Sequence, residues 1–327
     1  MKKTVTVAVA AVVSIIMVAA LLSQIKIGDI IDVFSRVNLP FLMLGFALYG
    51  VTHLFRSIRF RVLVKGRVGV KDMFSIVCVH TMTNEILPAK TGEISYIYLL
   101  KKLHGIKTGD GVASLVVARV FDAIMVSLIF VFSAMLISNL PDIIYGIIWF
   151  VSAFAALAVL VLVVFIRSGQ KFTRGFRKLV EGIGISRFGK VQYLLRKIDE
   201  TAQSFNEIGL KSILWKVTIS SIILWTFYYL TFYFIIQSFG VNLSFFDTVI
   251  ICSFSNLVLL LPITVFAGFG TTEGSIAVLM VLFGIGWGAA IATAFGIHIV
   301  SIIYLALFGV FGFWKLGTKA GKTNNVK

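Results

Sequence analysis

Two stretches of this 327-residue chain place ionisable side chains, prolines and glycines inside apolar sequence. The first, from Thr83 to Glu93, holds two carboxylates, a lysine, an amide, a proline and a glycine. The second, from Leu261 to Glu273, repeats this mixture with a proline, two glycines and one carboxylate. Because lipid cannot hydrogen-bond such groups, each stretch must be buried in protein or must line a water-filled cavity. We expect the two stretches to form the binding site of a membrane transporter.

The elements that position these stretches must be membrane helices. The chain is 59% hydrophobic and 13% charged, with a mean hydropathy of +1.00, which excludes an ordinary soluble domain. A helix needs about 20 apolar residues to cross about 30 Å of hydrocarbon. Runs of that length predict spans at 5–25, 39–60, 112–137, 143–166, 213–239 and 289–314.

The predicted fold class is all-α: a polytopic integral membrane protein with about six full spans and two re-entrant broken-helix hairpins as inverted repeats. The hairpins are expected at 73–100 and 245–283. Pro88 and Pro262 remove backbone donors and interrupt a helix. Gly92, Gly268 and Gly270 permit tight turns and close backbone approach. The alternative is that these residues only kink packed helices.

Charge distribution favours the hairpins over single crossings. If both segments enter and leave on one side, only Lys26 and Arg36 lie outside and Arg119 lies within the membrane, so 27 of the 30 Lys and Arg residues share one face. That face should be cytoplasmic, together with both termini. We therefore expect one transmembrane domain at 1–316 in the plasma membrane, with a short loop at 28–38. A cytoplasmic basic amphipathic segment is predicted at 167–211, and a polar, disordered tail at 317–327.

The order of these residues resembles a known family, the transmembrane region of lysylphosphatidylglycerol synthases. The motifs that carry the resemblance are Asn84-x3-Pro88-x3-Gly92-Glu93, Arg119-x2-Asp122, and Pro262 followed by Gly268-x-Gly270-x2-Glu273. The resemblance covers nearly the whole chain and implies a lipid flippase without the soluble aminoacyl-transfer domain. The sequence departs from the family pattern at Ala89-Lys90, at Ala118 and in the turn Val265-Phe266-Ala267.

Seven residues are candidates for substrate binding: Asn84, Glu85, Lys90, Glu93, Arg119, Asp122 and Glu273. Lys90 could face a phosphate and Glu93 a cationic group or a proton, or the two could form a structural pair. Arg119 and Asp122, three residues apart on one helix face, should pair with each other, or Arg119 should pair with a hairpin carboxylate.

Other polar and aromatic residues favour structural roles. His53, His80 and His298 lack metal-ligand spacing and should be hydrogen-bonded between helices. The aromatic run at 225–229 should be a packing surface. Cys78 and Cys252 should be buried free thiols rather than a disulfide.

The predicted function is translocation of a polar-headgroup lipid between leaflets through a midplane site. The alternatives are a secondary transporter of a small solute or ion and, third, a membrane-embedded lipid transferase. We expect no catalytic residues, no cofactor and no metal. The expected partners are membrane lipids, anionic or isoprenoid phosphate lipids among them, and a homodimer is an open alternative. The net charge of +16 fits cytoplasmic loops and anionic headgroups better than nucleic acid.

Overall fold

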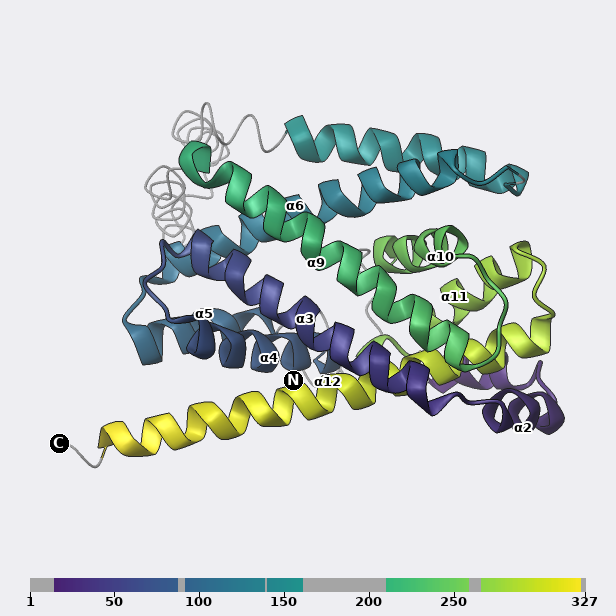
Figure 1. The fold of residues 1–327 in the computed structure, drawn as a ribbon, viewed down its shortest axis with the longest axis horizontal. Helices are drawn as coiled ribbons and strands as arrows, with labels where there is room; N and C mark the ends of the chain where they lie inside the picture. The colour runs from purple at the N-terminus through teal and green to yellow at the C-terminus, as the bar shows by residue number, and fades with distance from the viewer. Residues whose placement is uncertain (1–14, 88–91, 139, 161–209, 259–265, 325–327) are drawn as a thin grey trace, which may run out of the picture.

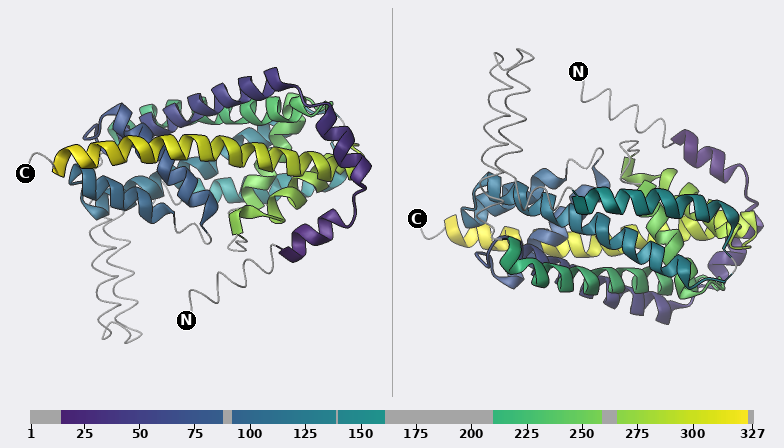
Figure 2. Two further views of the ribbon diagram at one scale, coloured as in Figure 1. Left: turned by 90° about the horizontal axis from the view of Figure 1, so that it is seen from below. Right: turned by 90° about the horizontal axis from the view of Figure 1, so that it is seen from above.

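The computed structural model describes residues 15–87, 92–138, 140–160, 210–258 and 266–324. All regular secondary structure in these ranges is helical, which confirms the all-α prediction. The helices run roughly parallel or antiparallel along the long axis of the molecule (Figure 1, Figure 2).

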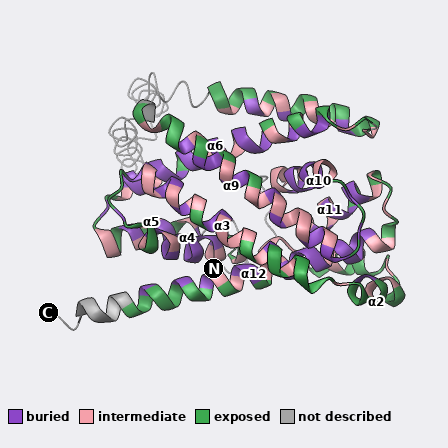
Figure 3. Ribbon diagram, viewed as in Figure 1, coloured by how far each residue is buried: buried purple, intermediate pink, exposed green. Residues whose placement is uncertain are grey.

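Five helices in the described ranges are long and apolar enough to cross a membrane. They are α3 (Leu39–Leu63), α6 (Thr108–Met135), the helix Asp142–Leu160, α9 (Leu210–Ser238) and α12 (Trp287–Asn324). The predicted span at 5–25 lies mostly outside the described residues, which show helix from Ile15 to Leu22. The sequence sets the start of α3, where the side chain of Asn38 accepts a hydrogen bond from the Phe41 N–H at 3.3 Å. Large apolar side chains on the outer faces are exposed, as lipid contact requires (Figure 3).

Four short helices form the two predicted hairpins. They are α4 (Val70–Ile86) with α5 (Glu93–His104), and α10 (Phe245–Val258) with α11 (Thr271–Leu282), preceded by the 3-10 turn η3 (Phe266–Gly268). At 1.5 Å per residue the longest of them, α4, reaches only about 26 Å, less than the hydrocarbon thickness. The first hairpin occupies one end of the bundle and the second occupies the other (Figure 1).

The first hairpin closes tightly because Gly92 has no side chain. A Cβ at this position would lie 2.2 Å from the Asn84 backbone nitrogen and 2.3 Å from the Thr83 carbonyl carbon. The hydroxyls of Thr83 and Ser95 then hydrogen-bond at 2.7 Å across the two helices. Gly92 therefore permits the close backbone approach that was predicted for it.

Two predictions about the chain ends are wrong. The predicted loop at 28–38 contains helix α2 (Ile27–Ser35), whose start is capped because the Lys26 N–H donates to Asp29 at 3.1 Å. The predicted disordered tail belongs to α12, which continues to Asn324. Leu316 is buried in a core cluster, so packing supports this helix beyond the apolar run from which its end was predicted.

The helices pack closely at glycines. A Cβ at Gly312 of α12 would lie 2.7 Å from the Ser75 carbonyl oxygen of α4, and a Cβ at Gly309 would meet the Met82 side chain. Small residues allow such close approach between membrane helices. Cys78 and Cys252 are buried and free, as predicted.

Candidate functional site

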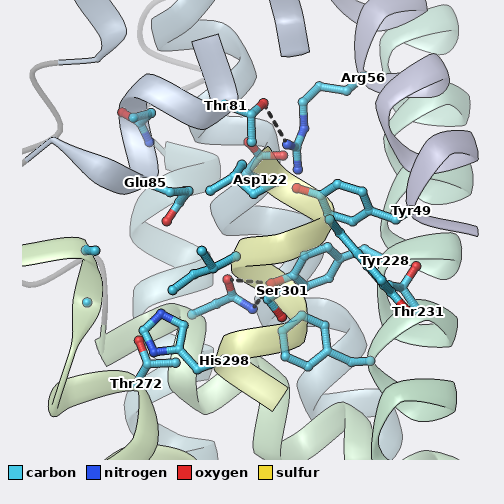
Figure 4. Close-up of a pocket in the computed structure, with 18 of the residues that line it drawn as sticks. Tyr49, Arg56, Thr81, Glu85, Asp122, Tyr228, Thr231, Thr272, His298 and Ser301 are labelled. Carbon is cyan, nitrogen blue, oxygen red and sulfur yellow. Dashed lines mark hydrogen bonds between the residues drawn. The ribbon is translucent and has the colours of Figure 1, made fainter. Parts of the chain in front are cut away.

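A cavity of about 490 Å³ lies between the tips of the two hairpins. Residues 84–87 of the first hairpin and residues 267–272 of the second both line it, and α3, α6, α9 and α12 supply the remaining walls. Figure 4 shows Arg56 and Thr81 at one end and His298 and Thr272 at the other. The structure thus brings together the two stretches that the sequence placed 170 to 180 residues apart.

Arg59 and Asp122 form a two-pronged ion pair at the cavity wall. The Arg59 guanidinium nitrogens lie 2.6 and 3.2 Å from the two carboxylate oxygens of Asp122. Trp225 also donates its indole N–H to Asp122 at 3.0 Å, and Arg59 donates to Ser221 at 3.2 Å. Arg59 is only 1% exposed, so this pair ties α3, α6 and α9 together inside the bundle.

Arg119 pairs with a hairpin carboxylate. Its Nε donates to Glu93 Oε1 at 2.9 Å, joining α6 to the first turn of α5. Of the two pairings predicted for Arg119, the structure contains this one, whereas Asp122 pairs with Arg59. Arg119 lines the cavity, and Glu93 lies behind it.

Arg56 lines the cavity without a carboxylate partner among the described residues. Its guanidinium donates to the Thr81 hydroxyl at 3.3 Å, and Tyr49 lines the same region (Figure 4). Since Arg59 and Arg119 are both neutralised by carboxylates within 3 Å, Arg56 is the cavity guanidinium left to meet an anion in this part of the chain. A guanidinium can bind phosphate oxygens through two parallel hydrogen bonds.

The tip of the first hairpin contributes Asn84 and Glu85 to the cavity. Asn84 is 6% exposed, and its side-chain oxygen has no hydrogen-bond partner within the described ranges. Glu85 is exposed and forms no ion pair there. Both residues therefore have hydrogen-bonding capacity to offer a ligand.

Glu273 lies apart from the cavity surface. Its side chain is fully buried and accepts the Gly270 N–H at 2.7 Å, while the other oxygen lies 2.7 Å from His298 Nδ1. His298, in turn, lines the cavity. Glu273 is thus linked to the cavity by its hydrogen bond with His298, and its direct contact with substrate remains a prediction.

The histidines follow the expected pattern in part. His298 is bonded between helices, and His80 Nδ1 lies 3.5 Å from the Gly92 carbonyl of the neighbouring helix. His53 instead bonds to Tyr49 within its own helix at 3.1 Å. No group of three or more metal-ligating side chains gathers within the described ranges.

Some cavity residues were missed from the sequence. Arg56 and Arg59 were counted from the sequence only among the basic residues of the cytoplasmic face, whereas in the structure both belong to α3 and line the cavity. Their position inside an apolar span was the usable signal, since intramembrane charges mark sites. Trp225 and Tyr229 of the aromatic run at 225–229 pack in a core cluster, as predicted, and Tyr228 packs against it. Trp225 and Tyr228 also line the cavity, which the sequence did not indicate.

Several predictions fall outside the described residues or are only partly visible. Lys90, Pro88, Pro262 and nearly all of the basic segment 167–211 lie outside the described ranges. Gly268 and Gly270 have φ angles of 76° and 88°, so the second hairpin does use glycine to turn.

Comparison with known proteins identifies a family. The model of the lysylphosphatidylglycerol synthase TM region matches residues 7–309. The chain is also similar to the UPF0104 membrane protein MJ1078 of Methanocaldococcus jannaschii, with 28% identity over 238 residues, covering 71% of this chain and 92% of that protein. No solved structure matches the chain.

Proposed function

The chain belongs to the family of the lysylphosphatidylglycerol synthase transmembrane region, and on this premise we propose that it moves a lipid with an anionic, polar headgroup between leaflets. The observation that carries the proposal is the cavity between the two hairpin tips, with Arg56 on its wall and no ion pair to that guanidinium in the described structure.

The chemistry of the cavity fits a lipid phosphate. An uncompensated cation inside a membrane protein is costly, so a binding site that keeps one is prepared for an anion. Arg56 would meet the phosphate, and the Thr81 and Tyr49 hydroxyls stand beside it on the cavity wall. Asn84 and Glu85 would contact the donor groups of the headgroup. The volume of about 490 Å³ accommodates a headgroup but not two acyl chains, which would stay in lipid.

The hairpins supply a physical route across the membrane. Each brings an interrupted helix to the middle of the bundle, and such paired hairpins can expose one site to either side in turn. The Arg119–Glu93 pair would transmit movement of the first hairpin to α6. The headgroup would bind while the site is open to one side of the membrane and would be released after the site has opened to the other side.

The second candidate function is transport of a small anionic solute. The same observation supports it, because a half-buried guanidinium on the cavity wall would bind a free phosphate or carboxylate as well. The two functions differ in whether an acyl-bearing molecule is moved.

The test is translocation of headgroup-labelled phosphatidylglycerol in proteoliposomes made from the lipids of the source cells. Arg56→Gln should slow translocation about tenfold or more, because a hydrogen bond to a charged group contributes about 1.5–3 kcal/mol. The matched control is Arg36→Gln, which removes an exposed arginine paired with Asp32 and distant from the cavity. It should translocate like the wild type.

Equal translocation rates for Arg56→Gln and wild type would show that Arg56 does not bind the headgroup. If the folded wild-type protein moves no lipid class, but takes up a small anion such as phosphate, the second candidate replaces the first.

A further inference from the structure

The second hairpin holds a buried acid–imidazole pair that the binding site does not use directly. Glu273 Oε1 lies 2.7 Å from His298 Nδ1, and Glu273 is 0% exposed. His298 comes from α12 and lines the cavity (Figure 4). The centroid of the Phe269 ring lies 4.6 Å from that of the imidazole. His298 therefore faces the cavity, whereas Glu273 is buried and does not line it.

The two hydrogen bonds fix which nitrogen can take up a proton. An ionised carboxylate only accepts hydrogen bonds, so His298 Nδ1 carries the hydrogen that points to Glu273. In the neutral imidazole, Nε2 then holds the free lone pair, and it has no hydrogen-bond partner among the described residues. Water in the cavity can protonate this nitrogen.

The pair differs from the other charged pairs of the cavity. The Arg59–Asp122 and Arg119–Glu93 pairs contain guanidinium groups, which keep their proton at every physiological pH. Histidine is the side chain whose ordinary titration falls between about pH 5 and pH 8. His80 also lines the cavity, but it bonds to a backbone carbonyl rather than to a carboxylate.

The Phe269 ring and the Gly270 N–H, both from the turn between η3 and α11, contact the pair directly. The charged groups that face the same cavity are Glu85 from α4, Arg56 and Arg59 from α3, and Arg119 and Asp122 from α6. With His298 neutral, the pair carries one negative charge. Protonation converts it into a neutral ion pair, which a buried site tolerates better.

Glu273 also connects the pair to the shape of the hairpin. Its second oxygen accepts the Gly270 N–H at 2.7 Å, at the turn that leads from η3 into α11. Ala267 and Gly270 adopt φ angles of 49° and 88° there, so the turn depends on local hydrogen bonds. A change in the charge of the pair changes the strength of the hydrogen bond from the Gly270 N–H to Glu273, which holds this turn.

We infer that the Glu273–His298 pair is a proton-binding site that couples movement of the second hairpin, and hence lipid translocation, to a proton gradient. The inference rests on the proposed function. A proton passes from cavity water to His298 Nε2 on one side of the membrane and returns to water on the other side, while Glu273 stays ionised. One proton that moves with one monoanionic lipid makes the cycle electroneutral.

The experiment uses full-length protein in vesicles of phosphatidylethanolamine and phosphatidylglycerol, with headgroup-labelled phosphatidylglycerol as the probe and the membrane voltage clamped at zero. A gradient of one pH unit corresponds to 1.36 kcal/mol, so one proton per lipid should shift the ratio of probe between leaflets about tenfold. An entrapped pH dye reports proton movement in the same vesicles.

Two variants and one control separate coupling from folding. His298→Gln and Glu273→Gln keep hydrogen-bonding side chains at both positions, and Glu273→Gln can still accept from Gly270. Both should lose the tenfold shift while still allowing the probe to equilibrate. The control is His53→Gln, which changes a buried histidine that has no carboxylate partner in the described structure and does not line the cavity. It should keep the shift.

Three results would overturn the inference. If the wild type equilibrates the probe with no response to the pH gradient, coupling is rejected and the proposed function stands. If His298→Gln keeps the wild-type shift, this pair is rejected as the proton site. Absence of probe movement in folded wild type rejects the proposed function and, with it, the coupled mechanism.

Discussion

At the scale of single residues, the arginines that line the cavity in the described structure form ion pairs with carboxylates, with one exception. Arg59 meets Asp122 and Arg119 meets Glu93, whereas Arg56 meets only the Thr81 hydroxyl within the described structure. Pairing is what makes the first two tolerable in a buried environment. The exception is informative because it lies on the wall of the cavity.

The Arg59–Asp122 pair should be important for stability. Asp122→Asn would leave the Arg59 guanidinium, 1% exposed, without its counter-charge. Breaking a buried pair from one side costs about 3–5 kcal/mol, and the partial exposure of Asp122 to the cavity places the expected loss near the lower value. Thermal unfolding in detergent should therefore occur at a clearly lower temperature than in the wild type.

A double substitution checks that the loss arises from the unpaired charge. Arg59→Met combined with Asp122→Leu removes both charges, and it should recover much of the stability lost in Asp122→Asn. If Asp122→Asn melts like the wild type, the pair contributes nothing to folding and Asp122 serves the cavity alone.

The sequence located the site residues better than it assigned their partners. Glu93, Arg119 and Asp122 were recognisable because each is ionisable inside apolar sequence. Their partners depend on which helices lie side by side, which no local pattern encodes. Asp122 therefore pairs with Arg59, which is 63 residues away in the sequence, and not with Arg119, which is three residues away.

At the scale of the elements, the hairpins could be predicted because proline and glycine interrupt runs that would otherwise span. Residues 84–93 and 256–273 contain both the helix-breaking residues and the polar groups. The same residues therefore predicted where the hairpins lie and that they carry polar groups into the bundle. Helix α2 and the end of α12 were missed for the opposite reason. Their helices depend on capping and on packing of single residues such as Val33 and Leu316, which an apolar-run criterion ignores.

Gly92 should be indispensable to the first hairpin. Gly92→Ala places a methyl group 2.2 Å from the backbone nitrogen of Asn84, and backbone cannot move aside as a flexible side chain can. We expect α4 and α5 to separate near their tips, with lower thermal stability and loss of the Thr83–Ser95 bond. Thermal unfolding in detergent and translocation in proteoliposomes measure the two effects.

The matched control for this change is Gly274→Ala in the second hairpin. A Cβ at Gly274 meets nothing within 4 Å, and alanine is favoured over glycine in a helix by about 0.5–1 kcal/mol. This variant should be as stable as the wild type or slightly more stable. Equal tolerance of alanine at both positions would contradict the close contact at Gly92.

At the scale of the whole molecule, charge is distributed unevenly along the long axis. The end of the bundle that holds the first hairpin carries Lys65, Lys71, Lys101, Lys102 and Lys107. The opposite end carries Asp29, Asp32, Asp142 and Asp247 with Lys26 and Arg36. Short loops rich in lysine and arginine stay in the cytoplasm, so the end that holds the first hairpin should face inward.

Labelling of single cysteines tests this orientation together with both hairpins. In a background with Cys78→Ser and Cys252→Ser, the probes Lys65→Cys and Lys107→Cys flank the first hairpin, while Asn242→Cys and Gly286→Cys flank the second. All four positions are exposed, and a Cβ at Gly286 meets nothing within 4 Å. A membrane-impermeant maleimide applied to intact cells should label Asn242→Cys and Gly286→Cys, and it should reach the other two only after permeabilisation.

Each hairpin is tested by the two cysteines that flank it, because a segment that enters and leaves on one side gives both of its flanks the same accessibility. A segment that crosses once must give them opposite accessibility, since its two ends emerge on different faces. Opposite labelling of Lys65→Cys and Lys107→Cys would therefore contradict the first hairpin, and with it the shared cavity on which Arg56 and His298 depend. Matching pairs with inside and outside exchanged would keep both hairpins and place the end that holds the first hairpin outside the cell.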